Sequence, residues 1–537
     1  MPLKAGSRKR DPIRAAFLGG SCLFFLAIVW VNFHSGPWYS FDMYADAYLA
    51  RLMAEQRTLF PENWVFGNQY YVIATPVVAA FFYALCHNTV LAMSLASSLM
   101  TLLVLGSFVW CCRPFLSRRA LAVGFFCLIG AVILADSAGT SPFGLQIFYT
   151  MASYYACYLW GILFHLGIYL RLREGRRVSS PLLLLALLTD LAFGMQSLRE
   201  TLALNIPLLL LELWNLCTRG RERRSTVFVL LSLGFNLAGT RLIRLFAIHS
   251  SPIIEPVRLS FSPAVLSQRL SACLTGLFEI SGLRYWYESG SRRVLFLPAL
   301  FFWLVVIAAL VLLLRRRDRS PGARLLLFSF VSLMCVCGVG VFLFRTRAIY
   351  YFVWFLLVSL CFSYLADALP DGRLSRLLLT GLLLCGALSF LFHFYPDYRK
   401  YPRYRDFYTR IADELCEAGV DTLYLDFLTQ PSLAACSDDR LVAATFRYEF
   451  DDAEHPFPAY PHLKPVELFA RPDPEHAVIV LSASAYGGVS SLDFIRENAP
   501  PAFREALERK LSCIRTETLD YTTLVFYRFT DPSIFSP

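Results

Sequence analysis

A long series of apolar stretches runs from residue 15 to residue 394. Each is about 17 to 25 residues long, enough for a helix to cross the roughly 30 Å hydrocarbon core of a bilayer. A water-soluble core cannot bury them all, because 56% of the chain is hydrophobic and only 17% is charged; soluble domains carry roughly a quarter charged residues. The pattern predicts a polytopic α-helical membrane protein with about eleven spans, at residues 15–34, 89–110, 119–135, 151–170, 180–197, 201–217, 225–247, 294–314, 324–344, 348–366 and 374–394.

Clusters of basic residues alternate with these spans and predict their orientation. Short cytoplasmic loops retain Lys and Arg, so we expect the N-terminus inside a bacterial cytoplasmic membrane and the C-terminal region outside. Segment 72–86 would break this alternation if it crossed fully, so we expect a re-entrant or interfacial helix there. The net charge of +10 reflects the same bias, and we expect no nucleic-acid partner. The clusters lie at residues 4–14, 113–119, 171–177, 219–224, 315–319 and 373–376.

The composition changes at about residue 395, after which no stretch could span a bilayer. We therefore expect a transmembrane bundle over 1–394, with a first external loop of interfacial helices at 35–88, and an extracytoplasmic α/β domain over 395–537. Alternating apolar patterns and turn residues predict the elements of that domain: helices at 404–418 and 491–510, and strands at 422–428, 476–484 and 522–529.

The cysteines and histidines indicate no particular chemistry. Most of the 15 cysteines lie within predicted spans, where a free thiol behaves as a small apolar residue. The outer domain holds Cys416, Cys436 and Cys513, an odd number that does not support an obligatory disulfide framework. None of the eight histidines is spaced as a zinc pair on one helical turn, so the sequence leaves a metal site unknown.

Two acids stand just beyond the first span, in SFDMYADAYLA. Asp42 and Asp46 are four residues apart, so on a helix they share a face and could converge on one substrate or cation. The alternative is a solvated helix N-terminus, where the helix dipole favours Asp. We predict a catalytic role for Asp42 and a weaker one for Asp46, since ionisable groups held at a membrane face are functional candidates.

Arginines at two outward turns are candidates for binding an anion. Arg199 and Glu200 lie side by side between two apolar runs with almost no loop. This position is equally compatible with an ion pair between the two residues and with a bidentate contact of the Arg199 guanidinium with a phosphate. Arg345 and Arg347 are expected at an outward turn, whereas the other basic clusters are expected in the cytoplasm. This favours a role in binding an anionic ligand over simple contact of their side chains with lipid headgroups. Weaker candidates lie near the outer end of another span, at Arg241 and Arg244.

The first hundred residues resemble the GT-C superfamily of integral-membrane glycosyltransferases, which includes protein O-mannosyltransferases and aminoarabinose transferases. The matching pattern is a first span, an acid in a long external loop, a helix running to LFPENWVFGNQYY, and a further span beginning near HNTVLAM. Met43 stands where many relatives have Glu, and the Lys-Pro-Pro pattern of some relatives is absent around Thr75 and Pro76. These differences are compatible with a different acceptor or with a member that lacks activity.

The resemblance implies an inverting transfer of a sugar from a polyprenyl-phosphate donor to an envelope glycan, lipid or protein outside the cytoplasmic membrane. Asp42 would act as general base, or would ligate a divalent metal as in metal-dependent branches. Lipid-linked sugar and membrane lipid are the expected partners, and the oligomeric state is not predicted. Arg199, Arg345 and Arg347 would hold the lipid phosphate, with support from Glu200, Tyr70 and Tyr71.

Two other classes of function stay open. The number of spans suits a transporter or flippase, although such proteins tend to bind substrate near the midplane between internal repeats, whereas no clear repeat occurs here and the notable charges lie toward the outer face. A non-catalytic envelope assembly protein would bind a partner through its outer domain. In that case removal of residues 400–537 would abolish function and Asp42 would be dispensable.

Overall fold

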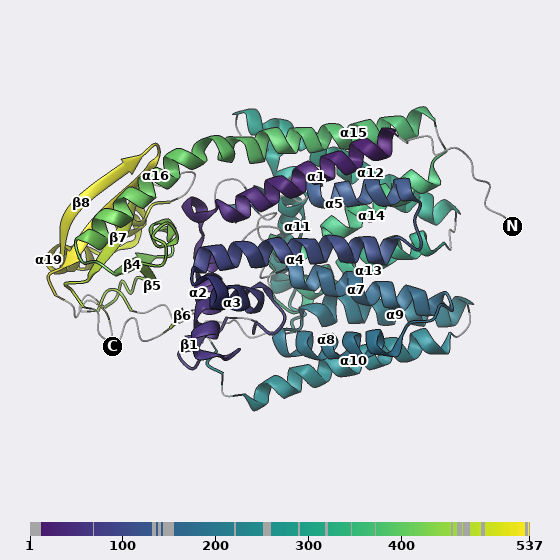
Figure 1. Cartoon of the computed structure of the whole chain (residues 1–537), viewed down its shortest axis with the longest axis horizontal. Coiled ribbons are helices and arrows are strands. Elements are labelled where there is room, and N and C mark those ends of the chain that lie inside the picture. The colour runs from purple at the N-terminus through teal and green to yellow at the C-terminus, as the bar shows by residue number, and fades with distance from the viewer. Residues whose placement is uncertain are drawn as a thin grey trace.

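The computed structural model shows a helical bundle with a smaller α/β unit at one end (Figure 1). Within the part of the chain that the structure describes, seven stretches are long and apolar enough to cross a membrane, by length and composition: Pro12–Phe33, Thr89–Cys112, Arg223–Leu245, Arg293–Arg316, Pro321–Phe342, Ala348–Ala368 and Arg373–Phe392. The structure describes residues 12–67, 69–131, 136–137, 141–142, 155–219, 222–246, 248–250, 259–287, 290–316, 320–344, 346–370, 372–452, 455–458, 464–465, 473–484, 489–531 and 535.

A helix lies at every span that the sequence predicts. The multi-pass helical architecture is therefore confirmed, while the count of eleven crossings stays a prediction. The helices of the bundle are α1 Pro12–Phe33, α2 Phe41–Gln56, α3 Thr75–Cys86, α4 Thr89–Cys112, α5 Arg118–Ala131, α7 Ala156–Arg173, α8 Ser180–Gln196, α9 Ile206–Arg219, α10 Arg223–Leu242, α11 Pro263–Ile280, α12 Phe296–Arg316, α13 Pro321–Phe342, α14 Val353–Ala368 and α15 Arg373–Ser389.

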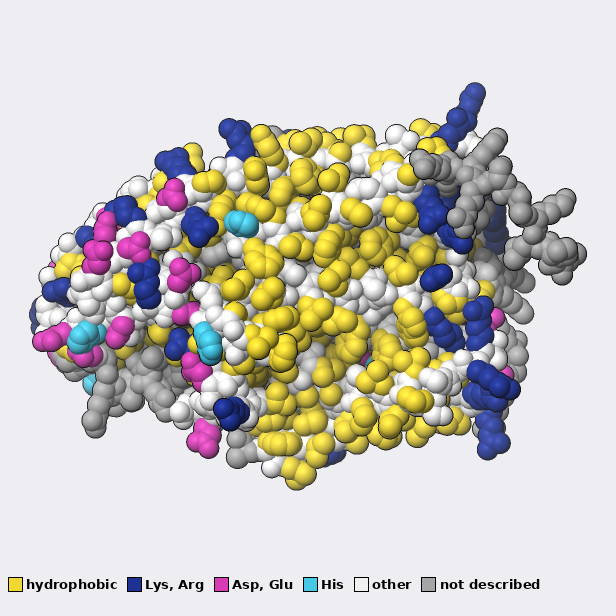
Figure 2. Space-filling view, viewed as in Figure 1, with side chains coloured by type: hydrophobic (Ala, Val, Ile, Leu, Met, Phe, Trp, Pro, Cys, Tyr) yellow, Lys and Arg dark blue, Asp and Glu magenta, His cyan; other side chains and the backbone are white. Residues whose placement is uncertain are grey.

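Apolar side chains cover the outside of the bundle as well as its interior. Large hydrophobic residues on several helices are more than half exposed, and they form the yellow region in the middle of the molecule (Figure 2). Burial of these side chains in hydrocarbon is favourable, so this region is the surface that lipid covers. By contrast 94% of the Ala348–Ala368 stretch is buried by protein, which makes α14 the centre of the bundle. The exposed residues include Leu23, Leu184, Leu230, Leu304 and Leu377.

Two helices of the bundle differ from the long spans. Helix α3 has 12 residues, about 18 Å at 1.5 Å per residue, so it is too short to cross a bilayer alone. Helix α11 has 18 residues and was not among the predicted elements. It packs against α13 and against the short helix η7, Ala348–Tyr351. Gly276 of α11 permits this approach, because a Cβ atom there would lie 2.7 Å from the Tyr351 ring.

The α/β unit is built on a mixed five-stranded sheet in the order β5-β4-β7-β9-β8. Strands β5 Val442–Phe446, β4 Thr422–Asp426 and β7 Ala477–Ser484 are parallel, while β9 Thr522–Phe529 runs antiparallel to β7 and to β8 Leu511–Leu519. Strands β5 and β8 were not predicted. The predicted helix at 491–510 is wrong as a single element, because Pro500 and Pro501 divide it into α18 Ser491–Asn498 and α19 Pro501–Lys510.

The chain passes from the bundle into the α/β unit without a linker. A π-helical turn, η8 Phe390–Phe394, joins α15 directly to α16 Tyr395–Glu417, and the long helix runs along one side of the molecule (Figure 1). Helix α2 shares an apolar core with α16 and the sheet. The Tyr44 hydroxyl accepts a hydrogen bond from the Ala443 backbone N–H at 3.1 Å. The α/β unit therefore rests on the loop that carries Asp42.

Candidate active site

Asp42 lies in the first turn of α2, close to the start of the helix. The Ser40 hydroxyl caps this end by accepting a bond from the Met43 N–H at 3.4 Å. The side chain of Asp42 is accessible to solvent, yet enclosure by the protein raises the pKa of its carboxyl above the ordinary value. The Asp42 carboxyl is therefore accessible to water although the surrounding protein disfavours its charged form.

Arg347 and Tyr155 lie close enough to this carboxylate to interact with it electrostatically. The Arg347 guanidinium opposes the effect of enclosure and lowers the pKa of Asp42. Arg347 precedes η7 and its side chain is exposed. Tyr155, at the start of α7, is 3% exposed, and the charges of Arg199 and Asp42 both act on its hydroxyl. The structure thus brings three predicted site residues, Asp42, Arg199 and Arg347, into one neighbourhood.

Arg199 lies among three tyrosine rings. Its guanidinium carbon is 5.5 Å from the ring centroids of Tyr155 and Tyr350 and 5.9 Å from that of Tyr158. Cation–π attraction is strongest when the cation is partly desolvated, as here. The guanidinium also donates a hydrogen bond to the Gln69 side-chain oxygen. These contacts hold a permanent positive charge in a fixed orientation, as recognition of a phosphate requires.

Gln196 joins the segment of residues 70–73 to the turn that carries Arg199. Its side-chain oxygen accepts bonds from the backbone N–H groups of Val72 and Ile73, at 3.2 and 3.1 Å, and its backbone oxygen accepts one from Tyr70 at 2.9 Å. The Tyr158 hydroxyl lies 2.6 Å from the Ser197 hydroxyl and receives a bond from the Gln196 amide at 3.0 Å. The loop containing Asp42 and the arginine turn are therefore held as one unit.

The other predicted acid has different surroundings. Asp46 is on the same helix as Asp42, but its side chain has no solvent exposure. Burial raises the pKa of Tyr39, and charges including that of Asp46 add to this effect. Asp46 therefore contributes to the packing of α2 beneath the α/β unit, and its catalytic role stays a prediction.

The remaining predicted residues lie as follows. The Tyr70 hydroxyl is 2.9 Å from the Ser250 hydroxyl, and the Tyr71 ring is fully buried next to Phe66. Arg345 lies outside the described residues. Two exposed arginines are found at the end of α10 and in the turn after it, Arg241 and Arg244.

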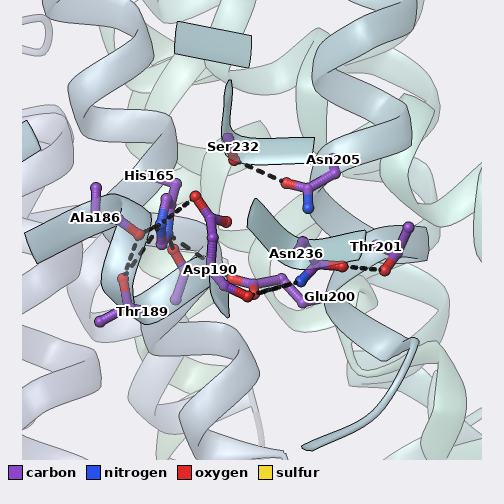
Figure 3. Close-up of polar contacts among 10 residues, drawn as sticks. His165, Ala186, Thr189, Asp190, Glu200, Thr201, Asn205, Ser232 and Asn236 are labelled. Carbon is purple, nitrogen blue, oxygen red and sulfur yellow. Dashed lines mark hydrogen bonds and ion pairs between the residues drawn. The ribbon is translucent and has the colours of Figure 1, made fainter. Parts of the chain in front are cut away.

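Glu200 belongs to a buried polar cluster inside the bundle (Figure 3). Its Oε1 atom lies 3.8 Å from His165 Nδ1, and Asp190 Oδ2 lies 3.3 Å from Nε2 of the same ring. Glu200 and Arg199 therefore face different surroundings, although they are neighbours in the chain. The sequence prediction missed His165 and Asp190 because it placed the notable charges at the outer face. A lone acid within the predicted span 180–197 was the signal that could have found this cluster.

These three side chains have the composition of a metal site. Among the residues that the structure describes, His165, Asp190 and Glu200 are a group whose donor atoms lie within 4.8 Å of one another. A metal needs the lone pair of an imidazole nitrogen. Here Nδ1 lies 2.8 Å from the Gly161 carbonyl oxygen and Nε2 lies 3.0 Å from that of Ala186. Carbonyl oxygens only accept hydrogen bonds, so both nitrogens act as donors and the cluster does not suit a metal ion.

No protein-family model matches the chain, and no curated protein matches it. Solved structures do resemble it. The crystal structure of ArnT from Cupriavidus metallidurans in the apo state aligns with a TM-score of 0.50 at 14% identity, over 97% of this chain and 99% of that chain. The structure of the same protein bound to undecaprenyl phosphate aligns with a TM-score of 0.49 at 14% identity, over 96% of this chain and 99% of that chain.

The likeness to apo ArnT extends over nearly the full length of both chains, including the bundle and the α/β unit. The resemblance to GT-C membrane glycosyltransferases is therefore confirmed at the level of the fold. At 14% identity this likeness concerns the fold alone.

Proposed function

We propose that the protein is a membrane glycosyltransferase that moves a sugar from a polyprenyl-phosphate donor to an envelope glycan, lipid or protein on the outer face. The observation that carries this proposal is the enclosed but accessible Asp42 carboxylate, which shares one neighbourhood with Arg347 and, through Tyr155, with Arg199. A carboxylate opposite guanidinium groups supplies both a proton acceptor and a site for a phosphate. The fold, which is shared with apo ArnT, supports the same class of reaction.

Asp42 acts as the general base. Its carboxylate takes the proton of the acceptor hydroxyl while the acceptor oxygen forms a bond to the anomeric carbon of the sugar. The bond between that carbon and the phosphate oxygen breaks, and its electron pair remains on the polyprenyl phosphate. Direct displacement inverts the anomeric centre. The pKa of Asp42, raised by enclosure, makes the carboxylate a stronger base than an ordinary Asp.

The arginines stabilise the leaving group. Negative charge grows on the phosphate oxygen as the glycosidic bond breaks, and fixed cations lower the free energy of that state. Arg199 is held by the three tyrosine rings and Gln69. Arg347 is exposed and close enough to Asp42 to affect its pKa. We therefore expect Arg347 to contact the phosphate on the side of the base, and Arg345 stays a candidate by its sequence position.

One observation favours the transporter alternative, namely that the buried ionisable cluster lies within the membrane bundle, as in many transporters. His165, Asp190 and Glu200 have no solvent exposure, however, and their polar atoms face one another and the backbone. A transport site has to be reached from water on both sides in turn. The transferase accounts for Asp42 and the arginines, so we prefer it.

Transfer by the purified protein tests the proposal. With a labelled polyprenyl-phosphate sugar and an acceptor extract, Asp42→Asn is expected to lower turnover by about 100-fold or more, the usual contribution of a general base. The substitution keeps the shape of the side chain. It also removes a charge that enclosure disfavours, so the variant is expected to fold.

Glu55→Gln is the matched control because Glu55 is on the same helix and is 43% exposed, in an ion pair with Arg51. This variant is expected to keep wild-type turnover. Full turnover of Asp42→Asn would show that the base is assigned wrongly.

A further inference from the structure

The buried cluster of Figure 3 includes Glu200, which is the residue next to Arg199 in the chain. His165 is on α7, seven residues after Tyr158, which places it about 10 Å further into the bundle. Asp190 is on α8, and Glu200 follows the end of that helix. All three side chains are 0% exposed. A charged side chain is costly in such a place unless it is compensated.

The hydrogen bonds of His165 define its charge. Both ring nitrogens donate to backbone carbonyls, of Gly161 at 2.8 Å and Ala186 at 3.0 Å, so the ring is an imidazolium. Asp190 Oδ2 lies 3.3 Å from Nε2 of this cation, and Glu200 Oε1 lies 3.8 Å from its Nδ1. Both oxygens of Asp190 and Oε1 of Glu200 make no other hydrogen bond within the described part of the chain. Their pairing with the ring is therefore what stabilises them in the bundle.

Glu200 links this cluster to Arg199, its neighbour in the chain. Glu200 Oε2 accepts a bond from the Asn236 amide at 3.4 Å, and the same amide donates to the Asp190 backbone oxygen at 3.2 Å. The π-helical turn η3, Thr201–Asn205, begins at the next residue. Thr201 bonds to the Asn236 side chain. Asn236 thus fixes the backbone of the turn on the side of the buried cluster. The Arg199 side chain contacts Gln69 and the three tyrosines instead.

We propose that His165, Asp190 and Glu200 form a charged anchor that positions Arg199 for the lipid phosphate. These are positioning residues, since they act through the backbone of the turn and not by contact with substrate. The inference rests on the phosphate-binding role proposed for Arg199. Replacement of the Glu200 carboxyl disturbs the contact of Oε1 with the imidazolium and the hydrogen bond that Oε2 accepts from Asn236, and the turn then relaxes. Arg199 loses its fixed direction as a result.

A double-mutant cycle on the full-length protein in detergent tests the anchor. The probe is undecaprenyl phosphate, and its Kd is measured for wild type, Glu200→Gln, Arg199→Gln and the double variant. Glu200→Gln is expected to weaken binding about tenfold, within the range of coupling between neighbouring residues. In the Arg199→Gln background the same change is expected to have no further effect, because Glu200 acts through Arg199. Equal weakening in both backgrounds, or no weakening, overturns the proposal.

Glu212→Gln is the matched control. Glu212 is also a buried carboxylate, 2% exposed, and it pairs with Arg173 at 3.3 Å and accepts a bond from Tyr169 at 2.8 Å. This variant is expected to lower the melting temperature and to leave the Kd unchanged. If Glu200→Gln does not yield folded protein, Glu200→Asp replaces it, because that change keeps the charge and shortens the side chain. It is expected to weaken binding in the same direction.

Hydrogen exchange gives a second result that needs no lipid. Backbone amides of residues 198–205 are expected to exchange faster in Glu200→Gln than in wild type, and at the wild-type rate in Glu212→Gln. Unchanged exchange in Glu200→Gln overturns the anchor. If wild-type protein does not bind the lipid phosphate at all, the proposed donor class fails, while hydrogen exchange still decides whether Glu200 fixes the turn.

Discussion

Asp42 combines solvent access with an unfavourable environment for its charge. A raised pKa means that the folded protein holds the proton more tightly than the unfolded chain does. The protonated carboxyl therefore contributes stability that is present below the ordinary pKa of Asp and is lost as pH rises through the raised value. At neutral pH the ionised carboxylate lowers the free energy of unfolding. A carboxyl group whose ionised form is disfavoured by the folded protein is typical of a functional site.

The pH dependence of transfer is expected to reflect the pKa of Asp42. Only the ionised carboxylate accepts a proton, so activity falls on the acid side as pH drops through the raised pKa, at a pH above about 4. Arg347 lowers this pKa, so Arg347→Gln is expected to move the acid limb of the pH–rate profile to higher pH. The measurement is kcat/KM against pH for both proteins.

Arg241→Gln is the control for this profile, since Arg241 is an exposed arginine at the end of α10. Its acid limb is expected to coincide with that of wild type. An acid limb that does not move in Arg347→Gln would mean that the titrating group is not Asp42.

Some site residues could be found from the sequence and others could not. Asp42 stood out as an ionisable group near a membrane face, although a helix N-terminus also favours Asp, and Arg347 stood out because it opposes the basic bias of the other loops. Gln69 and Tyr155 carry no such signal, since a glutamine in a loop and a tyrosine inside a predicted span are common. Their role depends on the packing of the external loop against the turn at Arg199, which sequence patterns do not reveal.

Close packing of α8 against α10 supports the arginine turn. Gly194 of α8 and Gly239 of α10 lie where the helix backbones touch, because an added Cβ atom on either would collide with a backbone oxygen, of Asn236 and Leu191 respectively. Small residues allow such contact between membrane helices. The approach also brings Asn236 within reach of Glu200 and Asp190. The geometry of the turn therefore depends on two glycines that bear no polar group.

Gly194→Ala is expected to separate α8 from α10 and to lower stability by about 1–3 kcal/mol, the usual cost of overpacking. Undecaprenyl phosphate binding is expected to weaken as well, because Asn236 moves away from the turn. The measurements are the melting temperature in detergent and the Kd for that lipid. Gly234→Ala, on α10 where no atom lies within 4 Å of the added Cβ, is expected to be neutral or stabilising by up to about 1 kcal/mol. Equal melting temperatures for the two variants would contradict this account.

Elements with strong hydrophobic signals were predictable and the others were not. Spans such as 89–110 and 324–344 coincide with α4 and α13 to within a few residues. Helix α11 escaped prediction because polar residues such as Gln268 and Arg269 interrupt its apolar pattern. Strand β8 alternates exposed and half-buried residues at the edge of the sheet, and so resembles a loop in sequence. A periodic apolar pattern arises where one face of an element is buried. Both α11 and β8 have few buried residues, so their patterns are weak.

The whole molecule is polarised along its long axis. Acidic and basic side chains mix over the α/β unit, whereas basic side chains gather at the opposite end of the bundle (Figure 2). The α/β unit is docked by contacts from separate parts of the chain: Ser432 donates to the Pro37 carbonyl at 3.0 Å, and Asp439 accepts from the Thr89 N–H at 2.6 Å. Removal of residues 400–537 would therefore also expose the core beneath α2, so point variants separate catalysis from assembly better than truncation does.

Chemical labelling tests the orientation that this polarity predicts. Basic loops stay in the cytoplasm, so the α/β unit and Asp42 are expected to face outward. In a single-cysteine protein that retains Cys513, which is exposed on β8, a membrane-impermeant maleimide is expected to react in intact spheroplasts. A single-cysteine protein with Arg177→Cys, in the exposed loop after α7, is expected to react only after permeabilisation. The reverse pattern would place Asp42 in the cytoplasm, where a base for envelope glycans could not meet its acceptor.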